Sequence, residues 1–153
     1  MNEILVRKAT LIDLNILLTF EQGIIEAERP YDPTLKPEKI SYYDIKEMID
    51  AHDVQVVVAV IDEVIVGSGY ARIEKAKPYL KHNNFGYLGF MYTVPEYRAR
   101  GVNKAILTFL EKWCLEKEIT ELRLDVYNDN LAAIKAYEKS GFKKHLINMR
   151  LGI

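Results

Sequence analysis

The sequence contains a single cysteine, Cys114, so it can form neither an internal disulfide bond nor a cysteine-rich metal site. Its 21 basic residues are balanced by 22 acidic ones, and the net charge of -1 gives no overall attraction to nucleic acid or to an anionic lipid surface. No stretch approaches the roughly 18 consecutive apolar residues of a membrane-spanning helix. We therefore expect a protein that binds neither nucleic acid nor membrane.

The N-terminal stretch MNEILVRKAT lacks the basic start, long apolar run and small-residue cleavage site of a secretory signal, which favours a cytoplasmic location. The three histidines, His52, His82 and His145, lie 30 and 63 residues apart, and this spacing is unlike that of metal ligands, so no metal is expected. At 153 residues, without a repeat or a linker, the chain is expected to form one domain over residues 1–153.

Hydrophobic periodicity predicts one order of helices and strands along this domain. A strand at residues 4–10 precedes a helix that a capping box of Thr10 and Asp13 opens, and Ser41 with Asp44 opens a second helix after a proline-rich loop. Residues 54–74 have the pattern of a β-hairpin in which Gly67 and Gly69 mark a bulge or a close backbone approach. Further strands are predicted at residues 85–94 and 121–127, helices at 102–114 and 128–141, and one or two strands at 142–153.

The stretch TVPEYRARGVNKAIL, residues 93–107, leads from the end of a predicted strand through a proline into an amphipathic helix. A helix N-terminus leaves backbone N–H groups unpaired and carries partial positive charge, so a turn that enters one favours an anion. Arg98, Arg100 and Lys104 add positive charge, and Gly101 permits a positive φ or close approach of a ligand. On spacing alone, a pyrophosphate site and a plain turn with solvated arginines are equally good interpretations.

The wider context of this turn resembles the GCN5-related N-acetyltransferase (GNAT) family, whose members transfer an acetyl group from acetyl-CoA, usually to an amine. YTVPEYRARGVNKAIL and LRLDVYNDNLAAIKAYEKSGF carry the resemblance, which extends from Phe85 to Phe142. The family's pyrophosphate motif falls on Arg98, Gly101 and Asn103, where Asn103 replaces the usual Gly or Ala. We interpret this departure as a change in the affinity or pose of the cofactor. The later motif falls on Asn130, Ala132, Ala133, Tyr137, Gly141 and Phe142.

The resemblance implies an α/β fold with a mixed, mostly antiparallel central sheet of roughly six or seven strands, flanked by about four helices. It also implies that the strands at 85–94 and 121–127 splay apart, so that the arm of acetyl-CoA pairs with the first of them. Backbone N–H groups in the first strand would then polarise the thioester carbonyl, an effect worth about 3 kcal/mol. The cofactor-binding residues that the resemblance implies are Met91, Tyr92, Val94, Arg98, Ala99, Arg100, Gly101, Val102, Asn103, Lys104, Asn130 and Tyr137.

Tyr137 is the catalytic residue that the resemblance implies, because a phenol can donate a proton or a hydrogen bond to the departing CoA thiolate. Taken by themselves, the residues favour a structural role. If Gly141 ends the helix, Tyr137 and Phe142 form the hydrophobic pair that commonly closes a Schellman motif. Asn130 likewise has two candidate roles, to cap this helix and to bind the cofactor, and the two roles are compatible.

An acceptor amine must lose a proton before it attacks, so a carboxylate or a chain of waters has to assist it. Glu21 and Glu28 lie seven residues apart in the otherwise apolar stripe of the first predicted helix. Either the end of this helix leaves the core and both glutamates face water, or they line a pocket. No residue is identified as the general base. In the family the region between the first two helices often lines the acceptor pocket. The substrate-binding candidates are therefore Glu21, Glu28, Arg29, Tyr31 and Asp32, and Asp125 and Tyr127 on the later strand are secondary candidates.

The sequence therefore predicts an acetyl-CoA-dependent N-acetyltransferase whose acceptor is a small cationic primary amine that attacks the thioester directly. A protein lysine or N-terminus is the alternative acceptor, and a regulatory module that holds acyl-CoA without catalysis is the alternative function. Residues 75–84 form either a flap or a solvated loop. The C-terminal stretch HLINMRLGI either pairs with a second copy in a homodimer or forms an edge covered by its own loop.

Overall fold

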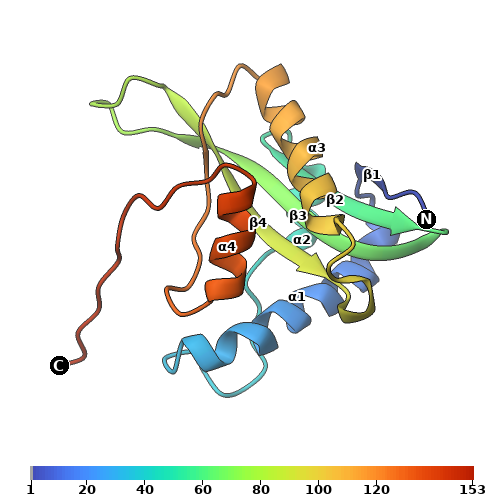
Figure 1. Cartoon of the computed structure of the whole chain (residues 1–153), viewed down its shortest axis with the longest axis horizontal. Coiled ribbons are helices and arrows are strands. Elements are labelled where there is room, and N and C mark those ends of the chain that lie inside the picture. The colour runs from blue at the N-terminus through green and yellow to red at the C-terminus, as the bar shows by residue number, and fades with distance from the viewer. Residues whose placement is uncertain (1) are drawn as a thin grey trace.

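The protein folds around one central β-sheet, seen in a computed structural model that describes residues 2–153 (Figure 1). The strand order is β1-β2-β3-β4-β5, antiparallel throughout except that β4 and β5 are parallel. This arrangement confirms the predicted α/β fold with a mixed, mostly antiparallel sheet. The strands are β1 (Leu5–Lys8), β2 (Val54–Ile61), β3 (Val64–Lys75), β4 (Asn84–Thr93) and β5 (Leu122–Arg123).

Four α-helices cover the two faces of this sheet. They are α1 (Leu14–Glu28), α2 (Ile45–Asp50), α3 (Val102–Glu116) and α4 (Leu131–Lys139). Two hydrophobic clusters separate the layers, one beneath α1 and α2 and the other beneath α3, against which α4 also packs. Strand β2 contributes to both clusters, since Val57 and Ala59 face α3 while Val56 and Val58 face α1. Its nearly unbroken apolar sequence follows from burial on both faces.

The two predicted capping boxes have different outcomes. The Thr10 N–H donates to the Asp13 carboxylate at 2.8 Å, as predicted, and a short 3-10 helix (Leu11–Asp13) leads into α1. The second helix begins later than predicted, because Asp44, rather than Ser41, is its N-cap and accepts from the Glu47 N–H at 3.1 Å. The preceding N–H groups, at residues 42 and 43, donate instead to the buried Glu21 carboxylate, and this holds them outside the helix.

Close packing of α3 against β3 depends on the two glycines of β3. A Cβ added at Gly69 would lie 2.7 Å from Ile106 Cγ2, and one added at Gly67 would lie 2.8 Å from Val102 Cγ1. Both distances are too short for real side chains, so glycine is required at these positions. The close backbone approach that the sequence predicted is therefore present, and it sets the first turn of α3 against the end of the sheet.

The C-terminal part of the sheet is smaller than predicted. Only Leu122 and Arg123 of the predicted strand 121–127 pair with β4, opposite Gly86 and Tyr87, and beyond them the two strands separate. Residues 143–153, which were expected to supply one or two strands, form no regular element. The described part of the chain therefore contains five strands, instead of six or seven, because this last segment meets no strand with which to pair.

Candidate active site

A β-bulge interrupts β4 at the point where β5 has separated from it. The pairing register between β3 and β4 shifts between Ser68 and Tyr70, and Phe90 has a φ of 56°. A bulky residue in this left-handed region is strained, and such strain and bulges are both concentrated at functional sites. The fully buried Ser68 hydroxyl donates to the Phe90 carbonyl at 2.9 Å and holds the bulge in place. The bulge redirects the backbone at Met91, the residue expected to polarise the thioester.

The basic turn after β4 forms a concave run of backbone N–H groups. A short 3-10 helix (Pro95–Tyr97) ends β4, and Ala99 and Gly101 then adopt φ values of 62° and 87°. Gly101 is the N-cap of α3, and the first helical hydrogen bond runs from the Ala105 N–H to the Gly101 carbonyl at 3.0 Å. The N–H groups of residues 102–104 are therefore left unused by the helix. A Cβ at Gly101 would meet no atom within 4 Å, so the surface beside this residue is open. Glycine is therefore favoured here by its positive φ rather than by a lack of space.

Positive charge surrounds this turn. The Arg98 Nε donates to the Thr93 carbonyl at 3.3 Å, and the Arg100 guanidinium lies 5.2 Å from the centre of the Tyr97 ring. Lys104 is exposed, whereas Asn103 is half-buried and makes no side-chain hydrogen bond within residues 2–153. The turn thus combines free backbone donors, three cations and an unpaired amide, which is an arrangement suited to a pyrophosphate.

Tyr137 makes the structural contacts that its position in the sequence predicts. Helix α4 ends in a Schellman motif, because the Phe142 N–H donates to the Tyr137 carbonyl at 3.1 Å and the Gly141 N–H to the Glu138 carbonyl at 3.0 Å. The Tyr137 and Phe142 rings pack edge to face, 5.8 Å apart. At the other end of the helix, the Asn130 side chain accepts from Ala133 N at 3.2 Å, as a capping residue does.

The Tyr137 hydroxyl takes no part in these contacts. It makes no side-chain hydrogen bond within residues 2–153. Burial raises the pKa of Tyr137 to about 12, and the charge of Glu28 contributes to the rise. The hydroxyl is therefore protonated at neutral pH and free to donate.

Glu28, at the end of α1, is half-buried. Burial raises the pKa of Glu28, and the nearby negative charge of Asp32 adds to this effect. The Tyr42 hydroxyl lies near enough to lower the pKa of Glu28, although it makes no hydrogen bond of standard geometry and is itself buried without a partner within residues 2–153. Tyr42 lies at the expected start of the second predicted helix. Nothing in the local sequence could identify it as a neighbour of Glu28.

The segment after α1 places an aromatic pair and a second carboxylate beside Glu28. The Tyr31 and Tyr127 rings stack with their centres 5.7 Å apart. Burial, together with the charges of Glu28 and Asp32, raises the pKa of Tyr127. Asp32 accepts hydrogen bonds from the Thr34 N–H and hydroxyl, which with Arg150 lower its pKa to about 2. Three tyrosines therefore surround two carboxylates here: Tyr31, Tyr42 and Tyr127.

Two of the predicted substrate-binding residues hold the loop that carries this cluster. Glu21 is 1% exposed, and its Oε2 accepts from the N–H groups of Tyr42 and Tyr43 at 2.8 Å each. It is therefore not solvated, and its carboxylate is occupied by the backbone. Arg29 donates to the carbonyls of Lys36 and Glu38 at 2.7 and 3.0 Å. These contacts fix the path of residues 29–43 around Glu28.

Asp125 lies at the mouth of the opening between β4 and β5. Its Oδ2 accepts from the Tyr87 hydroxyl at 2.9 Å, and together with burial this raises the pKa of Tyr87. The Arg72 guanidinium also lies over the Tyr87 ring, 5.2 Å from its centre. Asp125 therefore bridges the two diverging strands. The sequence offered no signal for Tyr87 as its partner, because the pair is separated by a helix and two loops.

The remaining candidate groups are not part of this site. Cys114 is 1% exposed within the core beneath α3, and burial raises the pKa of its thiol to about 11. Among residues 2–153 no group of three or more His, Cys, Asp or Glu side chains is arranged to hold a metal ion. Likewise, none of the helices formed by these residues has the length and apolar character needed to cross a membrane.

Comparisons of this sequence with a family model and with a known protein both indicate an acetyltransferase. Residues 22–142 match the sequence model of the acetyltransferase (GNAT) family. An N-alpha-acetyltransferase of Saccharolobus solfataricus is 30% identical over 115 residues, which cover 71% of this chain and 68% of that protein.

Solved structures of distant sequence share the same fold. A tetramutant of the BH1408 protein of Bacillus halodurans superposes with a TM-score of 0.88 at 17% identity, over 97% of this chain and 99% of that one. A Clostridium acetobutylicum structure described as a predicted acetyltransferase with acetyl-CoA gives 0.73 at 19% identity, over 98% and 96% of the chains. An aminoglycoside N-acetyltransferase in complex with CoA, AAC(6')-Iy, gives 0.72 at 18% identity, over 97% and 99%.

Proposed function

Because this chain belongs to the GNAT family of acetyltransferases, we propose that it transfers an acetyl group from acetyl-CoA to a primary amine. The amine attacks the thioester carbonyl directly, a C–N bond forms, and the C–S bond breaks to release CoA. The observation that carries this proposal is the turn at residues 98–104, where free backbone N–H groups and three cations follow the bulged end of β4.

Acetyl-CoA binds, in this proposal, along the side of β4 that β5 leaves open. The free N–H groups of residues 102–104, with Arg98, Arg100 and Lys104, bind the pyrophosphate. The half-buried Asn103 amide adds a donor where the family usually has a small residue, and this changes how the phosphate is held. The Phe90–Met91 bulge supplies backbone N–H groups to the thioester oxygen, which becomes more negative as the amine attacks.

Two side chains move the protons in this mechanism. Glu28 accepts a proton from the ammonium form of the acceptor, and its raised pKa makes it a stronger base than an ordinary glutamate. Tyr137 donates its proton to the CoA sulfur as the C–S bond breaks. After the C–N bond has formed, the nitrogen loses its second proton, which returns to the Tyr137 phenolate through solvent. Activity should therefore fall as the pH drops through the pKa of Glu28, because the protonated carboxyl cannot accept a further proton.

The acceptor in this proposal is a small cationic amine. The carboxylates of Glu28 and Asp32 attract positive charge, and the rings of Tyr31, Tyr42 and Tyr127 offer faces that favour a desolvated cation. Asp125 adds a further carboxylate toward the cofactor side. A protein N-terminus is the second candidate, because it too is a cationic amine and because the relative that is 30% identical is an N-alpha-acetyltransferase.

An acceptor screen tests this function. Release of free CoA from acetyl-CoA is measured with polyamines, amino sugars, lysine peptides and peptides with different N-terminal residues. Rapid turnover of a di- or polyamine supports the small-molecule acceptor, whereas selective turnover of peptides that differ only at the first residue supports the second candidate. If acetyl-CoA raises the melting temperature but no amine is acetylated, the protein is a binding module instead. No change in melting temperature at saturating acetyl-CoA would refute the cofactor assignment.

We also propose that the chain forms a homodimer, in which the C-terminal segment makes the contact.

A further inference from the structure

The bulge in β4 changes which backbone N–H groups face the open side of this strand. Upstream of the bulge, the Gly86 N–H donates to the Glu121 carbonyl at 2.8 Å and so points toward the β5 side. Downstream of it, the Val94 N–H donates to the Val66 carbonyl at 2.8 Å and so points toward β3. Residues an even number apart in a regular strand point their N–H groups to the same side. The extra residue of the bulge has therefore reversed the alternation.

The reversal directs the Met91 N–H to the open side of β4. The Phe90 carbonyl and the Met91 N–H belong to one planar peptide unit, and in a trans peptide they point in opposite directions. The carbonyl points toward β3, where the Ser68 hydroxyl donates to it at 2.9 Å. The N–H must therefore point away from β3. Within the described residues β5 pairs with β4 only at Gly86 and Tyr87, so β5 does not accept from this N–H.

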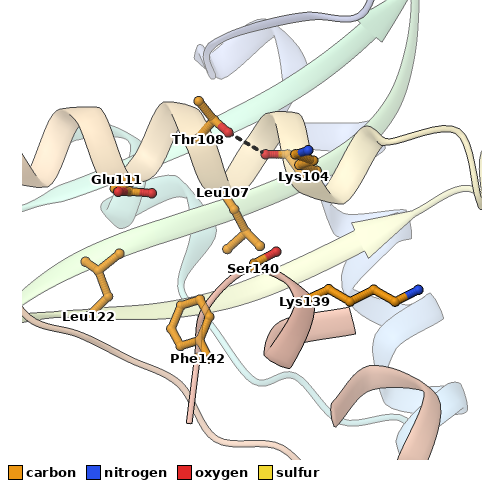
Figure 2. A pocket seen from close by; sticks show the side chains of 8 residues that line it. All are labelled: Lys104, Leu107, Thr108, Glu111, Leu122, Lys139, Ser140 and Phe142. Atoms are coloured by element: carbon orange, nitrogen blue, oxygen red, sulfur yellow. Dashed lines mark hydrogen bonds between the residues drawn. The ribbon is translucent and has the colours of Figure 1, made fainter. Parts of the chain in front are cut away.

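The proposed cofactor lies on the side to which this N–H points. On the β5 side of β4, a groove of about 260 Å³ lies between α3 and α4, and Leu107, Leu122 and Phe142 converge on it (Figure 2). Lys104, which follows the basic turn before α3, also lines this groove. A cofactor that is held by the turn can therefore extend along β4 on the side where the Met91 N–H is free.

Ser68 is placed to fix the orientation of this peptide unit. Phe90 has a strained φ of 56°, and a strained backbone relaxes unless its surroundings hold it. The Phe90 ring packs against Tyr43, with the ring centres 5.3 Å apart. That contact holds the ring, but rotation about ψ of Phe90 would turn the next peptide unit without moving the ring. The hydrogen bond from the fully buried Ser68 hydroxyl opposes this rotation.

The same hydrogen bond strengthens the Met91 N–H as a donor. A donor at the Phe90 carbonyl oxygen draws electron density from the peptide nitrogen, and linked hydrogen bonds polarise one another by about 10–30% per bond. The burial of Ser68 keeps water from competing for the carbonyl. One chain of hydrogen bonds would thus run from Ser68 through this peptide unit to the thioester oxygen.

We propose that Ser68 is a positioning residue for acetyl transfer, because its hydroxyl orients and polarises the peptide unit whose N–H donates to the thioester oxygen. Ser68 acts through the Phe90 carbonyl and touches neither acetyl-CoA nor the amine. This inference rests on the proposed function, which assigns the thioester to the bulge. It adds a buried residue of β3 to those on which the reaction depends.

Infrared spectroscopy of bound acetyl-CoA tests this role without any acceptor amine. Acetyl-CoA with and without ¹³C in the acetyl carbonyl is compared, so that the thioester band is separated from the protein bands. A donor at the carbonyl oxygen weakens the C=O bond and lowers its stretching frequency. The wild-type band should therefore lie below that of the thioester in an apolar solvent. In Ser68→Ala the band should return toward the apolar value and broaden, because the Met91 N–H is no longer held.

The matched control is Val56→Ala. Val56 is buried in the cluster beneath α1 and lies opposite Tyr70 in the pairing of β2 with β3. Its truncation removes buried apolar atoms and lowers the melting temperature, but it leaves the Ser68 hydroxyl in place. The thioester band of this variant should stay at the wild-type frequency. A shift that merely followed the loss of stability would appear in both variants.

Steady-state kinetics give a second readout. Removal of an oxyanion donor costs about 10²- to 10³-fold in kcat, so a donor that is present but poorly oriented should cost about 10- to 100-fold. The KM for the amine and the affinity for free CoA, which lacks the carbonyl, should stay within about threefold of the wild-type values. Ser68→Cys, whose thiol is a weaker donor, should give an intermediate kcat and an intermediate band.

The outcomes separate the role of Ser68 from the proposed function. A failure to bind acetyl-CoA, or a wild-type band at the apolar frequency, overturns both this inference and the assignment of the thioester to the bulge. A lowered wild-type band that Ser68→Ala leaves in place overturns the role of Ser68 alone. If Ser68→Ala does not fold, Ser68→Cys decides, and a band identical to that of the wild type overturns the role.

Discussion

Replacing Glu28 by glutamine removes one charge and one proton acceptor from the acceptor site while it nearly preserves the size of the side chain. If Glu28 is the general base, its loss should lower kcat by about 10²- to 10⁴-fold. A lost hydrogen bond to a charged group, worth about 1.5–3 kcal/mol, should in addition raise the KM for the amine by roughly 10- to 100-fold. The affinity for acetyl-CoA should not change, because the groups that affect Glu28 are Tyr42 and Asp32 and none belongs to the turn at residues 98–104.

The assay is free-CoA release with the best amine from the screen, measured from pH 5 to 9, together with titration of acetyl-CoA binding. The matched control is Glu26→Gln, since Glu26 lies on the same helix, is exposed and pairs only with Arg29. Unchanged kcat and KM in Glu28→Gln for every active amine would refute both roles of Glu28. A loss of acetyl-CoA affinity equal to the loss of activity would instead indicate a general disturbance of the fold.

The same substitution makes a prediction about stability. Folding raises the pKa of Glu28, so the ionised carboxyl is disfavoured in the folded state. Its contribution to stability is therefore most favourable below its ordinary pKa and is lost as the pH rises through the higher pKa of the folded state. Glu28→Gln should accordingly raise the melting temperature at pH 7 more than at pH 4. Equal melting temperatures at pH 7 would contradict the burial of this charge.

Two further changes separate catalysis from structure. Tyr137→Phe keeps the ring packed on Phe142 and should lower kcat by about 10- to 1,000-fold with little effect on acetyl-CoA affinity or melting temperature; unchanged turnover would leave the residue with its structural role alone. A separate prediction concerns stability. The Arg7 guanidinium donates a hydrogen bond to the Asp13 carboxylate at 2.8 Å and lowers the pKa of Asp13. The stability that this ion pair contributes is present at neutral pH and is lost as the pH falls through the lowered pKa of Asp13. Asp13→Asn should thus lower the melting temperature at pH 7, and the difference from wild type should shrink in acid; an equal loss at pH 2.5 would contradict the ionic origin.

Features that depend on neighbouring residues were predictable from the sequence. The left-handed φ of Gly101 and of Gly141 follows from local chain geometry, and so does the pairing of Tyr137 with Phe142 at the end of α4. The periodicity of residues 102–114 located α3, because one face of a helix must meet the sheet. These parts of the turn before α3 and of α4 needed no knowledge of distant contacts.

Features that depend on distant partners were not predictable in this way. The second helix starts three residues late because Glu21, on another helix, binds the backbone of Tyr42 and Tyr43. The predicted strand at residues 121–127 is shortened because β4 diverges from it, and a strand exists only where a partner accepts its hydrogen bonds. The buried Ser68 that supports the β4 bulge gave no signal in the sequence.

By itself the sequence determined the family, the order of the elements and the basic turn that enters α3, because motif spacing, side-chain period and backbone φ preferences are local properties. Only the tertiary structure decided that the two glutamates of α1 have different surroundings. The Glu21 carboxylate accepts hydrogen bonds from two backbone N–H groups, whereas Glu28 is half-buried with Tyr42 and Asp32 nearby. The same holds for residues 142–153, which were expected to form one or two strands, because a strand forms only where another strand accepts its hydrogen bonds.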